Sequence, residues 1–166
     1  MILKIILSLL GCISGLIIHF YPWLSGQQFD IFELKDISIG VSSWYGDVIT
    51  ELGIPIEIGE FRRGSWEGKT FFYDGLIFYI VGSTERSRRV EFFQIFCENY
   101  RLGGREELGL GSTKREVQQA ASRRRLISII ISYEPELIME VYHMHSSRSL
   151  VFTFDQNNVV TQIEVF

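Results

Sequence analysis

The amino-acid sequence predicts an α+β protein built from two tandem repeats and preceded by an N-terminal transmembrane helix. Each repeat is expected to be a helix plus a three-stranded antiparallel meander, and both meanders to form one sheet with helices on one face. Three observations support this prediction: an uncharged apolar stretch opens the chain, matching motifs recur 69 residues apart, and apolar residues alternate along several short segments. The predicted parts are a membrane anchor or signal segment over 1–30, a first repeat over 31–104 and a second over 105–166.

The composition narrows the classes of function. The chain has 166 residues, of which 46% are apolar, and a formal net charge of −4. This balance gives no general attraction to nucleic acid. The two cysteines, Cys12 and Cys97, are far apart in the sequence and too few for a metal site. We therefore predict no nucleic-acid partner, no metal and no cofactor.

The first part of the chain predicts attachment to a membrane. Residues 5–24 carry no charge, and as a helix they would span about 30 Å, the thickness of a bilayer core. Lys4 precedes this run, and no basic residue follows it until Lys35. This excess of positive charge on the N-terminal side of the run favours a cytoplasmic N-terminus. We expect a single-pass inner-membrane protein whose C-terminal domain lies on the extracytoplasmic, periplasmic side.

A second interpretation of this segment rests on Leu9–Cys12, whose letters LLGC look like a bacterial lipobox. Cleavage there would leave a lipidated Cys12, and a conventional cleaved signal peptide is a further alternative. The apolar run continues past Cys12 to Phe20, which is longer than a secretory signal needs. The length of the run therefore favours a retained anchor.

The remaining chain contains an internal repeat. IGVSSWYGDV at 39–48 matches LGLGSTKREV at 108–117, and the strand-like segments LIFYIV from Leu76 and VEFFQIF from Val90 match LVFTFD from Leu150 and VTQIEVF from Val160. The matches keep the same order, which indicates two copies of one unit. The identical pairs of the first match are Gly40 with Gly109, Ser43 with Ser112, and Val48 with Val117.

Local signals place the elements of each unit. Ser43 and Ser112 are expected to cap helices, the second of which should run from Thr113 to about Arg123. Gly53 followed by Pro55 predicts the end of the first helix. Asp-Gly at 74–75 predicts a hairpin, and DQNN at 155–158 a turn between the last two strands. IPIEIGEF (54–61) and LISIII (126–131) fit either strands or buried helical turns.

A resemblance follows from these motifs. A helix ending in Leu52-Gly53-x-Pro55 and then a meander, both doubled, resembles the β-lactamase inhibitor protein fold; the same unit occurs singly in the small lipoprotein of the outer-membrane β-barrel assembly machinery. The resemblance covers about residues 38–166 and implies binding of another protein. The second unit departs from it, since Arg124 stands where Pro55 would be. The other residues that carry it are Val48, Val117, Phe152–Phe154 and Val160–Ile163.

We therefore expect a membrane-anchored extracytoplasmic protein-binding domain of a bacterial envelope, without catalysis, acting in assembly and maintenance or as an inhibitor or immunity protein. Large aromatic residues near turns and arginines are common anchors of protein interfaces. The candidate binding residues are Trp44, Tyr45, Trp66, Arg88 and Arg89.

The alternative is an envelope hydrolase or metal-dependent enzyme that uses the sheet face around His143 and His145. Two histidines two residues apart in a strand share a face and could chelate a metal. A working site needs three or four ligands, and the sequence offers no evident third.

Overall fold

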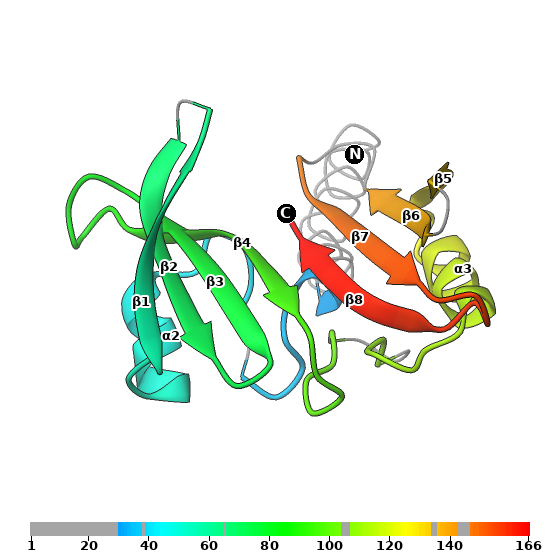
Figure 1. Cartoon of the computed structure of the whole chain (residues 1–166), viewed down its shortest axis with the longest axis horizontal. Coiled ribbons are helices and arrows are strands. Elements are labelled where there is room, and N and C mark those ends of the chain that lie inside the picture. Colours follow the sequence, from blue (N-terminus) through cyan, green and yellow to red (C-terminus); the bar gives the residue numbers. More distant parts are fainter. Residues whose placement is uncertain (1–29, 38, 65, 104–106, 134–135, 143–146) are drawn as a thin grey trace, which may run out of the picture.

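A computed structural model describes residues 30–37, 39–64, 66–103, 107–133, 136–142 and 147–166 (Figure 1). Most of the regular secondary structure in the described residues belongs to a single antiparallel sheet of eight strands. The elements, in chain order, are η1 (Asp30–Phe32), α2 (Tyr45–Leu52), β1 (Glu57–Arg63), β2 (Trp66–Tyr73), β3 (Leu76–Val81), β4 (Arg89–Ile95), α3 (Lys114–Arg123), β5 (Ile127–Tyr133), β6 (Glu136–Tyr142), β7 (Ser149–Phe154) and β8 (Val160–Val165).

The order of the strands is β1-β2-β3-β4-β8-β7-β6-β5, so each half of the chain forms a meander of four strands. The halves join where β4 pairs antiparallel with β8, at the centre of the sheet (Figure 1). Consequently β1 and β5 are the two edges of the sheet.

The predicted fold class was wrong in two respects. Each half has four strands instead of three, because the two ambiguous segments form β1 and β5. The two helices have 8 and 10 residues and are too short to cover one face of eight strands. Segments without regular structure also contribute to the core, through Leu34, Leu102 and Leu108.

The predicted N-terminal transmembrane helix receives no support either. Residues 5–24 and Cys12 lie outside the described residues. Within the described part of the chain, no helix is both long enough and apolar enough to cross a membrane.

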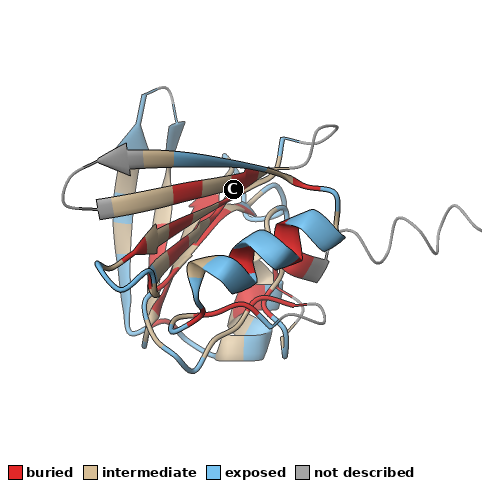
Figure 2. Cartoon of the chain, turned by 90° about the vertical axis from the view of Figure 1, so that its right-hand side faces the viewer, coloured by how far each residue is buried: buried red, intermediate tan, exposed pale blue. Residues whose placement is uncertain are grey.

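The core lies on one face of the strands and follows the alternation of the sequence. Leu76, Phe78 and Ile80 of β3 are buried and alternate with half-buried residues. Leu150, Phe152 and Phe154 do the same in β7. Both helices contribute to the same core, α2 through Val48 and α3 through Val117, Ala120 and Ala121. The α-helix that faces the viewer in Figure 2 is α3, whose buried positions alternate with exposed ones.

The matching motifs occupy equivalent places in the two halves. The Ser43 hydroxyl accepts a hydrogen bond from the Gly40 N–H at 3.0 Å, and the Ser112 hydroxyl accepts one from the Gly109 N–H at 3.1 Å. These serines therefore close a tight turn before each helix.

The predicted serine caps were displaced by one residue, because each serine hydroxyl already accepts a bond within its turn. The N-caps are Trp44, which has no side-chain cap bond, and Thr113. Thr113 and Glu116 form a reciprocal capping box, and these hydrogen bonds lower the pKa of Glu116.

The two helices end differently. Gly53 follows α2 with φ 79°, as the sequence predicted. After α3, Arg125 has a left-handed φ of 56°. The Leu126 N–H donates to the Ala121 carbonyl at 2.9 Å and the Arg125 N–H to the Ser122 carbonyl at 3.1 Å, which is a Schellman motif with arginine where glycine is usual.

Replacement of Arg125 by glycine should stabilise the protein, because glycine adopts the left-handed conformation without strain. We expect a gain of about 0.5–1 kcal/mol in the free energy of unfolding, measured by urea denaturation. Arg124→Gly is the matched control: its φ of −91° is ordinary, so this change should leave stability unchanged or lower it. Equal effects of both changes would refute the account.

Candidate protein-binding surface

Four of the five sequence-predicted binding residues come together beside the N-terminus of α2: Trp44, Tyr45, Arg88 and Arg89. The Trp44 and Tyr45 rings meet edge to face with centroids 5.3 Å apart, and the Arg88 guanidinium lies 5.8 Å from the centre of the Tyr45 ring. Tyr45 packs against Phe71 and the core, so its role is largely structural. Trp44 is 42% exposed.

Arg89 stabilises its own loop. Its guanidinium donates hydrogen bonds to the carbonyls of Arg86 and Arg88, both at 2.9 Å. The backbone of Arg89 also forms a bridge to Trp44. These contacts fix the loop between β3 and β4 against the start of α2. The binding role of Arg89 stays a prediction from the sequence.

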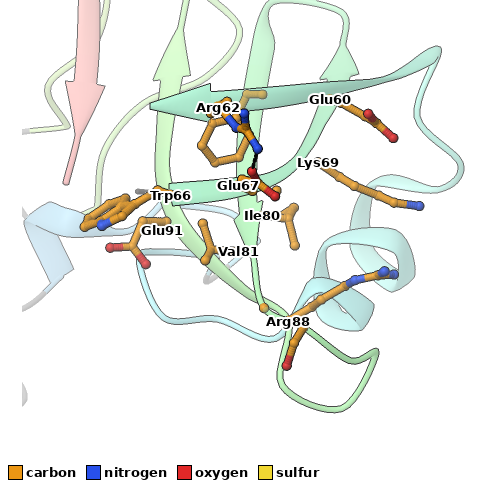
Figure 3. A pocket seen from close by; sticks show the side chains of 13 residues that line it. Glu60, Arg62, Trp66, Glu67, Lys69, Ile80, Val81, Arg88 and Glu91 are labelled. Carbon is orange, nitrogen blue, oxygen red and sulfur yellow. Dashed lines mark hydrogen bonds and ion pairs between the residues drawn. The ribbon is translucent and has the colours of Figure 1, made fainter. Parts of the chain in front are cut away.

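Trp66 and Arg88 line one groove, which we call the hairpin groove, with a volume of about 870 Å³ (Figure 3). The groove forms because β2 pairs with β1 as far as Trp66 but with β3 only as far as Gly68. The β1–β2 hairpin therefore extends past the end of β3, beside the β3–β4 loop. Trp66 is 46% exposed and is the largest apolar side chain of the groove.

The charges of the hairpin groove are mixed. Arg62 and Glu67 form an ion pair across the hairpin, and both side chains are well exposed to solvent (Figure 3). An exposed pair of this kind contributes about 0–1 kcal/mol. The charged residues of the lining are Glu60, Glu67 and Glu91 with Arg62, Lys69 and Arg88. This balance suits a partner that carries both signs of charge and is unsuited to a polyanion.

An aromatic cluster lies on the sheet face opposite the core, next to the groove. Tyr79 and Phe92 are stacked with centroids 3.9 Å apart, and Phe92 stacks on Phe166 at 5.3 Å. Phe61 meets both Tyr79 and Phe92 edge to face. The Arg63 guanidinium lies within 5.9 Å of the Phe92 and Phe166 ring centres. Aromatic pairs contribute about 0.5–1.5 kcal/mol each beyond their burial, so the cluster makes this face rigid.

Tyr79 is held neutral within this cluster. Burial, with the nearby Glu164 carboxylate, raises the pKa of the Tyr79 phenol, and the Arg63 guanidinium opposes the rise. The phenol donates a hydrogen bond to Gln94 Oε1 at 3.0 Å. The phenol proton is thus held by Gln94, within the sheet.

Sequence reasoning missed this cluster. Phe61, Tyr79 and Phe92 lie at strand positions that point away from the core. The alternation of side chains along a strand predicts that they share this face once the strands are known. Phe166 joins them only because β8 lies beside β4, and no local pattern predicts that pairing.

The catalytic alternative cannot be placed on this surface. His143 and His145 lie outside the described residues. Within the described ranges, no group of three or more His, Cys, Asp or Glu residues is arranged to hold a metal ion. Comparison with protein families, curated proteins and solved structures finds no match to this chain.

Gly68 at the base of the groove should not tolerate a side chain. A Cβ there would lie 2.2 Å from the Ile80 carbonyl oxygen and 2.7 Å from Phe61 Cε1. Because the backbone oxygen cannot move aside cheaply, we expect Gly68→Ala to cost about 1–3 kcal/mol of stability, measured by urea unfolding with tryptophan fluorescence.

Gly59→Ala in the neighbouring strand is the matched control for this substitution. Its Cβ would meet the Phe72 ring at 3.2 Å, and a side chain can shift. A cost for Gly68→Ala no larger than that for Gly59→Ala would contradict the packing described here.

Proposed function

We propose that this protein is a non-enzymatic protein-binding domain and that the hairpin groove is its main contact surface. The observation that carries the proposal is Trp66, an exposed tryptophan set in a groove with arginine and mixed charges, beside a rigid aromatic face. Tryptophan, tyrosine and arginine dominate the binding energy of protein interfaces. Loops and hairpins held by a rigid sheet are common positions for such residues.

The chemistry of the groove supports a protein partner over a nucleic acid or a small molecule. Its charged lining has as many acidic as basic side chains, so it would repel the phosphates of a nucleic acid as much as attract them. The groove also sets charged side chains beside the exposed ring of Trp66, and protein interfaces commonly combine aromatic with polar groups in this way.

The location of this binding domain stays a prediction from the sequence. We propose that residues 5–24 attach the chain to the inner membrane of a bacterial envelope, with the binding domain on the periplasmic side. Lipidation at Cys12 is the alternative. The resemblance to β-lactamase inhibitor proteins is likewise a proposal, and it adds the expectation that the partner is another protein.

Affinity capture with the full chain tests the binding proposal. The tagged protein would be extracted from membranes in detergent and its co-purifying proteins quantified by mass spectrometry. We expect Trp66→Ala to weaken capture of the partner about tenfold or more, which corresponds to about 1.4 kcal/mol or more of binding energy.

Trp44→Ala is the matched control, because Trp44 is almost as exposed as Trp66 but lies outside the groove lining. Capture of the same protein at equal levels by the wild type and the Trp66→Ala variant would contradict the proposal.

The identity of the captured proteins distinguishes the two biological roles. Several envelope proteins among the partners would indicate assembly or maintenance, and a single enzyme would indicate inhibition or immunity. The intact mass of the same preparation separates a full chain from one that begins at an acylated Cys12.

A further inference from the structure

The two edges of the sheet differ in chemistry. β1 carries the charged residues Glu57, Glu60, Arg62 and Arg63 among its seven positions, whereas β5 reads ISIIISY and has none. Natural sheets protect exposed edges with charges, proline or short strands, since unpaired N–H and C=O groups otherwise pair with another chain. β1 has such protection and β5 has not.

The apolar side chains of β5 remain accessible. Ile129 is 45% exposed and Ile130 is 46% exposed, and as successive residues of a strand they lie on opposite faces of the sheet. β5 pairs with β6 on one side, and no other described strand pairs with it. Each face of this edge therefore offers an isoleucine to an added strand, together with the free backbone groups between them.

The sequence of β5 is complementary to itself. In an antiparallel pair of two β5 strands centred on Ile130, Ile129 lies opposite Ile131 and Ser128 lies opposite Ser132. Like residues therefore meet at the five central positions, and Ile127 lies opposite Tyr133 at the ends. The strand carries no charge that would meet its own copy. A symmetric dimer needs this property, because the same patch must face itself across the two-fold axis.

We propose that β5 is the interface of a symmetric homodimer, in which two copies join edge to edge and extend the sheet across the two-fold axis at Ile130. A single strand of seven residues buries less area than a standard stable interface. The dimer should therefore exchange with monomer and grow with concentration. This interface lies at the opposite edge of the sheet from β1 and leaves the hairpin groove free.

A cysteine at the two-fold axis tests this proposal. In the full chain, with Cys12 and Cys97 replaced by serine, Ile130→Cys would face its own copy at a Cα–Cα distance of about 4.5–5.5 Å, within the range of a disulfide. Mild oxidation of the detergent-solubilised protein should convert most of it to a covalent dimer. Ile58→Cys, on the 53% exposed position of the β1 edge, is the matched control and should form no covalent dimer.

Sedimentation of the otherwise native full chain gives a second readout. Ile130→Lys puts two ammonium groups opposite each other at the axis and should abolish the concentration-dependent dimer, whereas Ile58→Lys should leave it intact. Circular dichroism of both variants checks that the sheet is retained. A wild-type monomer at all concentrations, or no more cross-linking at position 130 than at 58, would overturn the proposal. Cross-linking of position 130 only to a different polypeptide in envelope extracts would do so too.

Discussion

The arrangement of this protein depends on the shortest ladder in its sheet, the pairing of β4 with β8. Only three residue pairs form it: Phe93 with Val165, Gln94 with Glu164, and Ile95 with Ile163. The apolar members of these pairs are fully buried, and burial of each such side chain contributes about 1.5–3 kcal/mol. A four-stranded half alone would expose this apolar surface and a second sheet edge, at β4 or at β8. So small a unit has little core to compensate for that exposure.

This pairing also relates the two halves by an approximate two-fold axis. Gln94 and Glu164 face each other at the centre of the ladder, and they are equivalent positions of the repeat, 70 residues apart. The same symmetry makes the first strand of each half an edge. Because β1 and β5 then differ in sequence, one edge carries charge and the hairpin groove and the other is apolar. One duplicated frame can thus support two different contacts.

Local patterns predicted the elements that local interactions determine. Asp74-Gly75 joins β2 to β3 as expected, and Gly53 ends α2. The alternation of Leu150, Phe152 and Phe154 placed them in the core. IPIEIGEF and LISIII could not be assigned, because an edge strand is exposed on both faces and loses the clean alternation of a half-buried one. The aromatic cluster stayed hidden for a different reason: it requires Phe166 beside Phe92, a contact between the two halves that no local signal records.

Hydrogen exchange on the full chain tests the central claim, that the two halves form one sheet through β4 and β8. If they do, the backbone amides at 93–95 and 163–165 should be among the slowest to exchange and should open only with global unfolding. Fast exchange at these positions, while the β2–β3 and β6–β7 hairpins remain protected, would mean that the halves are stable apart. That result would contradict the account.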